Sequence, residues 1–427
     1  MFRGFIIILS LLYTVQTRSA GDGAKKNDDT LKSSNPQDSR VESGVCILNI
    51  DGALQYPPIL ADLSGSFLLP EGDDISRNIP VPQGEVMQVS CPGSSFGFDN
   101  IWEDGPVYAR CIEDSSFDVW TPDTEGEDRV FWEDMSCKSQ PRDNTEILGS
   151  CGPSEENTLI RIGFQIADNQ TTPTFTVCFD QTISRTLWVK HTLWDEISAQ
   201  DHGNSRPDFQ KDSFYDYDVD HAYSRNAQRE EISKLVGSQE LAEQYIEESG
   251  NLFLARGHLA PNADFIFFSW MDSSFHFINV APQWQTFNGL NWNSLENTVR
   301  NFIISRTFDA EIYTGTHGIL ELADVKGDMV DIYIYDGNRL PVPKFYWKIV
   351  LDPLQETGVA VIGVNNPHLT ELPASYILCP PLDNPTILEG VKEPENLYKG
   401  YIYACRVEEL AKVVEEIPSL PKVDLLQ

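Results

Sequence analysis

Residues 254–265 read Leu-Ala-Arg-Gly-His-Leu-Ala-Pro-Asn-Ala-Asp-Phe, and this stretch decides how the rest of the chain is interpreted. It combines a histidine and an arginine with a strand-like apolar beginning. A second dense segment follows, with Asn279, Asn288, Glu296 and Arg300 in fixed register. Together the two segments supply an imidazole base, arginines and an amide that can bind a metal ion.

The Arg-Gly-His tripeptide alone is weak evidence, because a chain of this length contains a given tripeptide by chance roughly one time in twenty. The ordered series Arg-Gly-His-x-Ala-Pro, Asn-Val-Ala-Pro-Gln and Phe-Asn-Gly-x-Asn-Trp-x-x-Leu-Glu-x-x-x-Arg is far more specific. This series resembles the DNA/RNA non-specific endonuclease family, in particular its secreted arthropod branch. The resemblance covers residues 206–300 well, the rest of the C-terminal half loosely, and roughly the first 150 residues hardly at all.

The local patterns agree with the ββα metal site that this resemblance implies. Residues 252–260 and 275–280 are strand-like, and apolar residues over 290–306 recur on one helical face. We expect an α+β fold, a ββα-metal nuclease core with a mixed, mainly antiparallel sheet and helices. Other predicted elements are a helix over 229–248 and strands over 158–166, 173–179, 311–316, 331–335, 343–352 and 358–364.

Hydrolysis of a phosphodiester requires a deprotonated water and neutralisation of charge on the phosphoryl oxygens. Histidine titrates near neutral pH, so His258 is the predicted general base. Asn288 is the predicted metal ligand, because Mg²⁺ accepts an amide oxygen and keeps most of its waters. We expect Mg²⁺ as cofactor, with Mn²⁺ as an alternative. Asn288 could instead form a turn or cap at the entry to the helix.

Two further residues are predicted to support the base and the ligand. Glu296 follows Asn288 by eight positions on the same helical face, where it could orient water at the metal or pair with Arg300. Asn279 resembles the family asparagine that positions the catalytic histidine and substrate. Hydrogen bonding to the backbone is the simpler explanation for such an asparagine.

Arg256, Arg300 and Arg206 are the candidates for stabilising charge in the transition state, because a guanidinium matches two phosphate oxygens. Arg206 rests on a looser match to the family's upstream arginine. One departure from the family is clear, since many members carry Asp directly before Arg-Gly-His and this chain has Ala255. The positioning of the neighbouring groups is therefore in question, although base and ligand are present.

The net charge of −34 opposes a nucleic-acid partner, which is normally bound by a basic surface. Residues 41–146 contain 21 Asp or Glu and five Lys or Arg, so much of the acid lies outside the predicted site. Beyond a Debye length of about 8 Å this field is largely screened. A local arginine cluster with a divalent cation could therefore still hold a phosphate.

The N-terminal residues predict export. Arg3 precedes an apolar run over 5–15 and small residues follow, as in a secretory signal peptide, and we expect no membrane span. The eight cysteines, none in a Cys-x-x-Cys pair, predict disulfides, with Cys379 and Cys405 as one candidate pair among about 105 possible connectivities. Asn169 begins a glycosylation sequon.

The chain is predicted to contain two folded domains. The organisation is a signal peptide at 1–20, a leader at 21–43, an acidic β-rich accessory domain at 44–152 and an endonuclease domain at 153–427. Short apolar runs at 66–69, 85–91 and 107–112 suggest the strands of the small, disulfide-tied first domain.

The leading hypothesis is a secreted, extracellular endonuclease that hydrolyses DNA and RNA, double-stranded forms included, and that, as the resemblance implies, leaves 5′-phosphate ends. Its partners would be DNA and RNA, with no protein partner evident. A second hypothesis is a catalytically silent nucleic-acid-binding homologue. A third is a secreted scaffold or binding protein whose acidic module is the working part. The presence of both His258 and Asn288 favours the enzyme.

Overall fold

The computed structural model describes residues 44–50, 54–71, 77–97, 107–122, 128–167, 170–202 and 206–427. The predicted signal peptide and leader, and the sequon residue Asn169, lie outside the described residues. No helix in the described part of the chain has the length and apolar character that a membrane span requires.

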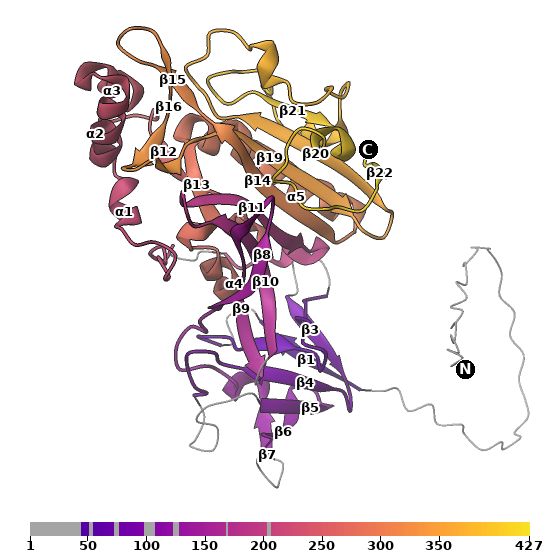
Figure 1. The fold of residues 1–427 in the computed structure, drawn as a ribbon. Helices are drawn as coiled ribbons and strands as arrows, with labels where there is room; N and C mark the ends of the chain where they lie inside the picture. Colours follow the sequence, from indigo (N-terminus) through magenta and orange to yellow (C-terminus); the bar gives the residue numbers. More distant parts are fainter. Residues whose placement is uncertain are drawn as a thin grey trace, which may run out of the picture. The chain divides into compact units, whose positions relative to one another are not determined.

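A nine-stranded sheet forms the centre of the molecule (Figure 1). Eight strands pair in the order β21-β20-β19-β14-β11-β10-β9-β8, all antiparallel, and β22 adds to β20 in parallel. The strands are β8 (Asn144–Cys151), β9 (Ser154–Ala167), β10 (Gln170–Asp180), β11 (Arg185–Leu193), β14 (Ala310–Ile319), β19 (Pro343–Asp352), β20 (Thr357–Val364), β21 (Ile402–Cys405) and β22 (Asp424–Leu425). The predicted α+β class with a mainly antiparallel sheet is confirmed.

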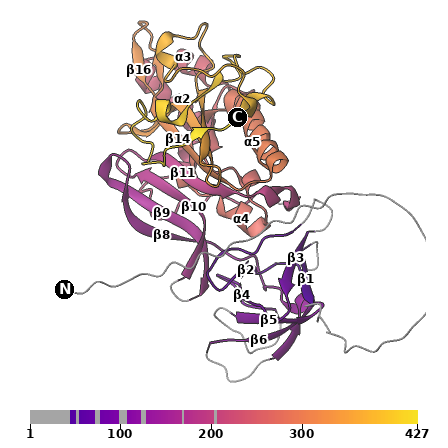
Figure 2. The same cartoon turned by 90° about the vertical axis from the view of Figure 1, so that its right-hand side faces the viewer.

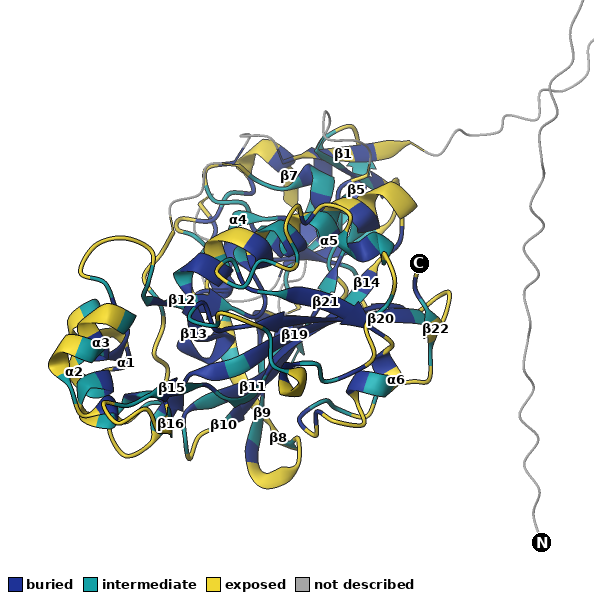
Figure 3. Ribbon diagram, turned by 90° about the horizontal axis from the view of Figure 1, so that it is seen from above, coloured by how far each residue is buried: buried dark blue, intermediate teal, exposed yellow. Residues whose placement is uncertain are grey.

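The central strands are buried on both faces. Along β19, Tyr346 and Val350 belong to the main hydrophobic core, whereas Trp347 and Ile349 belong to a second core on the opposite face. This division follows from the two-residue period of a strand, which sends successive side chains to opposite faces. Figure 3 shows the strands β19 and β20 buried, with the outer side of α5 exposed above the sheet.

Residues 44–143 form a smaller β structure, which we call the N-terminal module. Its strands are β1 (Val45–Asn49), β2 (Ile59–Ala61), β3 (Asn78–Pro82), β4 (Val86–Ser90), β5 (Val107–Glu113), β6 (Ser116–Trp120) and β7 (Asp128–Phe131), followed by the 3₁₀ turn η1 (Trp132–Asp134). β1 pairs with β3, and the others form the sheet β2-β4-β5-β6-β7. The predicted run over 66–69 is not a strand; it makes one isolated bridge through Phe67.

Four disulfides account for all eight cysteines. Cys46–Cys111 and Cys91–Cys137 lie in the N-terminal module, and Cys151–Cys178 joins β8 to β10. The predicted pair Cys379–Cys405 is confirmed. Small folds with limited apolar cores commonly depend on such cross-links, and the N-terminal module fits that pattern.

The N-terminal module packs against the large sheet through several contacts. β9 of the large sheet contacts β2 and β4 of the module (Figure 2). Ile59 and Ala61 of β2 belong to the main core. The proposed division at residue 152 would assign β8 to the first domain, whereas its hydrogen bonds join it to β9 in the large sheet.

The helices are short, and most lie on the strand connections. They are η2 (Asp195–Ala199), α1 (Val219–Ala222), α2 (Arg225–Val236), α3 (Gln239–Tyr245), η3 (Asn262–Asp264), α4 (Phe268–Ser273), α5 (Asn293–Arg306), η6 (Ala374–Tyr376), η7 (Thr386–Leu388) and α6 (Val407–Leu410). Two small hairpins pair β15 (Glu321–Ala323) with β16 (Met329–Asp331) and β17 (Tyr333–Tyr335) with β18 (Arg339–Pro341).

The prediction of one continuous helix over 229–248 is wrong, because two helices, α2 and α3, occupy this region. Gly237 takes a left-handed conformation with φ of 73° and ends α2, and Ser238 caps α3 by accepting a hydrogen bond from the Leu241 amide. Glycine after a helix and serine before one are the usual stop and start signals, and here they fall side by side.

Candidate active site

The quoted stretch forms the first strand of a ββα unit. β12 (Leu254–His258) pairs antiparallel with β13 (Val280–Trp284), and a π-helical turn, η5 (Phe287–Trp292), leads into α5. The strand predicted over 275–280 is wrong in position, since the 3₁₀ turn η4 (Phe277–Asn279) precedes β13. The aromatic residues before β13 are buried because they pack around Phe209, which explains the misleading apolar run.

The glycine of Arg-Gly-His is required by the pairing of these strands. A Cβ atom added at Gly257 would lie 2.3 Å from Oε1 of Gln283 on β13, closer than any side chain tolerates. Gln283 is fully buried, and neither of its amide atoms has a hydrogen-bond partner in the described structure. Gly257 therefore allows β12 to approach β13 closely, with His258 at the end of the strand.

A cleft of about 980 Å³ opens over the ββα unit. It is lined by six of the seven side chains that the sequence identified: Arg206, Arg256, His258, Asn288, Glu296 and Arg300. They come from the loop before α1, from β12, from the π-helical turn and from α5. The structure thus brings together groups separated by more than ninety positions in the chain.

Asn279 is the exception, because it does not line the cleft. Its side chain is fully buried and bonds only to backbone. The amide nitrogen donates to the carbonyl oxygens of Ala260 and Ser274 at 2.9 and 2.8 Å, and the amide oxygen accepts from the Ala260 N–H at 2.9 Å. Asn279 thus holds the backbone that follows His258, as a positioning residue.

His258 lies between two aromatic rings and two arginines. Phe209 and Phe275 are each 5.3 Å from the imidazole, centre to centre. Burial, together with the positive charges of Arg206 and Arg256, lowers the pKa of His258 to about 3. Its Nε2 atom is buried and has no hydrogen-bond partner in the described structure. The imidazole is consequently neutral over the physiological range and can accept a proton.

Arg256 is held by a carboxylate from another element. Its guanidinium pairs with Asp220 of α1 at 2.5 Å and lies over the rings of Phe209 and Tyr223. Asp220 of α1 thus supplies a carboxylate next to Arg256, whereas position 255 is Ala255. Local patterns in the sequence contain no sign of this contact, because the two residues are 36 positions apart.

Arg300 pairs with a residue that the sequence prediction missed. Its Nη1 donates to Asp264 at 2.5 Å, and the other carboxylate oxygen of Asp264 lies 2.9 Å from Nε2 of His191. The alternative ion pair of Arg300 with Glu296 is not formed among the described residues. Asp264 is the penultimate residue of the 254–265 stretch, and an aspartate next to an apolar run is a signal that could have been used.

Glu296 lines the cleft and interacts electrostatically with the buried Lys348. Burial raises the pKa of Glu296 to about 7, while the ammonium of Lys348 acts in the opposite direction. Lys348 is almost fully buried in β19 and donates to Thr314 Oγ1 at 2.6 Å. Lys348 is the charged residue within the apolar stretch 345–351, and a lysine in such a setting is a signal that sequence reasoning could have used.

Asn288 sits in the π-helical turn at the rim of the cleft. Its side-chain Nδ2 donates weakly to Gln285 Oε1 at 3.3 Å, and no hydrogen bond to its side-chain Oδ1 is present within the described residues, whereas its backbone carbonyl accepts from the Asn293 N–H. π-helical turns inside helices are frequently found at functional sites. An oxygen with open lone pairs that faces a cleft fits the hard, oxygen-binding Mg²⁺ ion.

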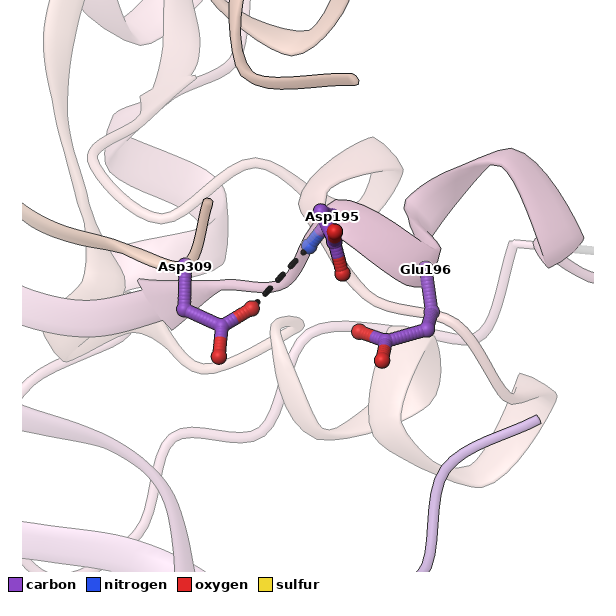
Figure 4. A group of neighbouring side chains, drawn as sticks. All are labelled: Asp195, Glu196 and Asp309. Atoms are coloured by element: carbon purple, nitrogen blue, oxygen red, sulfur yellow. Dashed lines mark hydrogen bonds between the residues drawn. The ribbon is translucent and has the colours of Figure 1, made fainter. Parts of the chain in front are cut away.

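A group of three carboxylates lies elsewhere (Figure 4). Asp195, Glu196 and Asp309 place one oxygen each within 4.8 Å of one another, and Asp309 accepts a hydrogen bond from the Asp195 N–H. None of the three lines the cleft. The metal ligand predicted from the sequence is separate from this group.

The cleft carries both cationic and anionic side chains. Four cationic side chains line it, from Arg206, Lys211, Arg256 and Arg300, together with the carboxylates of Asp208, Asp220 and Glu296. Three of these cations are paired with carboxylates: Lys211 with Asp218, Arg256 with Asp220 and Arg300 with Asp264. A phosphate entering the cleft therefore meets several guanidinium and ammonium groups despite the net charge of −34.

Residues 155–410 match the family model described as DNA/RNA non-specific endonuclease. The chain belongs to this family. A salivary endonuclease of the sandfly Lutzomyia longipalpis is 27% identical, over 85% of this chain and 77% of its own. The salivary protein Tsal2A of Glossina morsitans morsitans is 21% identical, over 88% of this chain and 92% of its own length. The mitochondrial endonuclease G of Bos taurus is 27% identical, over 54% of this chain and 69% of its own.

These findings confirm the resemblance read from the motifs, including the arthropod branch. The chain is accordingly a nuclease that acts on nucleic acid, in a metal-dependent family. Its match begins at residue 155, in β9, so the N-terminal module precedes the family region. The salivary relatives are matched over most of this chain, and their similarity extends beyond the family model.

Proposed function

We propose that this protein is a secreted, Mg²⁺-dependent endonuclease that hydrolyses DNA and RNA, double-stranded forms included, with little sequence specificity and leaves 5′-phosphate ends. The observation that carries the proposal is the convergence in one cleft of a neutral imidazole, an open amide oxygen and several arginines. Mn²⁺ is the alternative metal.

His258 is proposed as the general base. Its unpartnered Nε2 can accept a hydrogen bond from a water that attacks phosphorus, and the rings of Phe209 and Phe275 fix the plane of the imidazole. The backbone beyond His258 is fixed by Asn279. A low pKa makes the imidazole a weak base, but it keeps the base unprotonated at every pH at which the protein would work.

Asn288 would hold the metal ion through its carbonyl oxygen, with Glu296 placed to accept hydrogen bonds from water at the site. A divalent cation supplies charge neutralisation at the phosphate and a ligand for the leaving oxygen. The unpaired oxygen of Asn288 fits this requirement, whereas a cap or turn role would engage it in a hydrogen bond.

The arginines are proposed to bind and neutralise the phosphate. Arg256 and Arg206 flank His258, and Arg300 is fixed from behind by Asp264. Every one of these groups addresses the phosphate rather than a base edge, and phosphate contacts carry no sequence information. Low sequence specificity follows from this arrangement.

Secretion is proposed from the N-terminal apolar segment and the four disulfides, which are typical of oxidising compartments. The salivary relatives agree with this destination. We also propose the division into an accessory domain at 44–152 and an endonuclease domain at 153–427. Plain nucleic-acid binding without cleavage is the second candidate function.

The test is incubation of the purified protein with plasmid DNA and long duplex RNA, with and without EDTA. We expect cleavage of both substrates that EDTA abolishes and Mg²⁺ restores, with products that can be ligated only if they carry 5′-phosphates. Binding without cleavage under all metal conditions would identify the silent homologue instead.

A further inference from the structure

His276 makes buried contacts with two carboxylates beside the cleft. It follows Phe275, a wall of the cleft, and it is only 1% exposed. Its Nδ1 lies 2.7 Å from a carboxylate oxygen of Asp212, and its Nε2 lies 2.6 Å from a carboxylate oxygen of Asp143. With an acceptor at each ring nitrogen, the imidazole binds both carboxylates as a doubly protonated cation.

Asp212 ends the segment that carries one side of the cleft. We call residues 206–212 the cleft loop, because Arg206, Phe209 and Lys211 line the cleft. The loop is anchored to the residues around His276 by backbone hydrogen bonds: the Gln210 N–H donates to the Phe275 carbonyl, and the Phe277 N–H donates to the Gln210 carbonyl. His276 therefore lies directly beneath the loop that faces the substrate.

Asp143 belongs to the other side of the contact, the N-terminal module. The preceding residue, Arg142, donates its backbone N–H to the carbonyl of Pro92, which is adjacent to the Cys91–Cys137 disulfide. Asp143 is thus attached through Arg142 to the cross-linked part of the module, at the point where the chain enters β8 of the large sheet. The side chains of Asp143 and Asp212 are 6% and 14% exposed, so water screens this pair of contacts little.

We infer that His276 is a positioning residue that, by bridging Asp143 and Asp212, fixes the cleft loop to the N-terminal module and sets the placement of Arg206, Phe209 and Lys211 for nucleic acid. The module then takes part in substrate binding without contacting the substrate. This inference rests on the proposed function of the cleft. It gives the module, which lies ahead of the family region, a specific role in the reaction.

Other contacts of the module do not share this property. Arg77 pairs with Asp201 and donates to the carbonyl of Ala199, and the Phe67 ring packs on Trp270. These residues hold the module against η2 and α4, and none of them lines the cleft. The bridge through His276 is distinguished by its direct bond to the cleft loop.

The bridge is sensitive to pH. Burial alone would lower the pKa of His276, but the hydrogen bonds and charges of Asp143 and Asp212 outweigh it and raise the pKa to about 9. These two carboxylates and the neutral amide of Gln210, 3.3 Å from Nε2, face the ring. Because the pKa of His276 is raised in the folded protein, the contribution of the bridge to stability is complete below about pH 6.5. It is lost as pH rises through about 9.

The experiment uses the full chain with Asp143→Asn, which keeps the shape of the side chain and removes its charge. Near pH 6, where Asp212 alone keeps His276 protonated, we expect KM for duplex nucleic acid to be close to that of the wild type. Near pH 8.5 we expect KM to rise by about threefold to tenfold, with a smaller change in kcat, because the lowered pKa deprotonates His276. Glu146→Gln, an exposed carboxylate on β8 paired with Arg161, is the matched control.

Asp212→Asn is the second variant. Asp212 has a positive φ of 49°, a conformation that asparagine adopts readily, so the charge is removed without strain. NMR titration of His276 in each protein separates the inference from the proposed function. A His276 pKa near 6.5 in the wild type, or a KM whose pH dependence matches the wild type in both variants, would overturn the bridge. A wild type without metal-dependent cleavage would instead contradict the proposed function.

Discussion

The cleft region and the N-terminal module differ in which buried polar atoms lack a hydrogen-bond partner. Among the described residues of the module, Gln88 Oε1 and Ser90 Oγ are the buried side-chain atoms without a hydrogen-bond partner. Among the described residues beyond 187 there are more, and three of these atoms belong to residues that line the cleft: Oη of Tyr223, Nε of Arg256 and Nε2 of His258. Folding alone selects against such atoms, so the three in the cleft indicate groups kept for a ligand or water. The module, in contrast, is organised for stability.

The largest effect that this difference predicts is at His258. Replacement by alanine should lower kcat on plasmid DNA and duplex RNA by at least about a hundredfold, because the variant lacks the neutral imidazole proposed to accept the proton from water. The melting temperature should change little or rise, since the variant removes a buried unpaired atom.

His202→Ala is the control for this substitution, because His202 is exposed and does not line the cleft. It should retain wild-type cleavage. If His258→Ala also retained it, the unpaired imidazole would have to be regarded as a structural residue like those of the module.

The metal site should show the next largest effect. Asn288→Ala should reduce cleavage by about tenfold to a hundredfold at a fixed Mg²⁺ concentration, and more Mg²⁺ should be needed for half-maximal rate. Asn301→Ala, a substitution at an exposed position of α5, should behave as wild type. A rate loss that is independent of Mg²⁺ concentration would argue that Asn288 shapes the turn instead of binding the ion.

A buried ion pair offers a direct comparison of the two regions. Asp264→Asn leaves Arg300 and His191 without their shared carboxylate and should cost about 3 kcal/mol of folding free energy near neutral pH. Burial opposes the charge of Asp264, but His191 and Arg300 outweigh it and lower the pKa to about 2. The stabilisation is therefore present above about pH 4 and is lost as pH falls toward 2.

Asp118→Asn is the matched variant in the module, where Asp118 pairs with the half-exposed Arg129. It should cost less than about 1 kcal/mol, as exposed pairs do. Urea unfolding of both variants at neutral and acidic pH measures the difference. Equal losses of unfolding free energy at neutral pH would contradict the view that the buried ion pair of Asp264 contributes more to stability than the exposed pair of the module.

The sequence predicted the parts of the fold that depend on local patterns. The strand expected over 343–352 coincides with β19, because buried residues alternate there between two cores. Six of the seven predicted site residues line the cleft; five of them lie in fixed spacing within the motifs, whereas Arg206 rested on a looser match. The second strand of the ββα unit was misplaced, since Phe275 and Phe277 are apolar for aromatic packing rather than for sheet pairing.

Contacts between distant residues could not be predicted in this way. His276 meets Asp212 and Asp143 at separations of 64 and 133 positions, and Asp264 meets His191 at a separation of 73. Local periodicity contains no information about which carboxylate will face which imidazole. The role of the module in positioning the cleft loop is visible only in three dimensions.

The smallest expected effect concerns the acidic surface of the module. Glu113, Asp114, Glu133 and Asp134 are exposed, and their conversion to the corresponding amides should lower KM by about twofold at low ionic strength. The effect should vanish near 0.5 M salt, because charges beyond a Debye length of about 8 Å at physiological salt are screened. Deletion of the module would be a poorer test, since it would also remove Asp143. A change in KM that persists at high salt would mean that these carboxylates act on the substrate at short range, and the module would then be a binding surface rather than a support for the cleft loop.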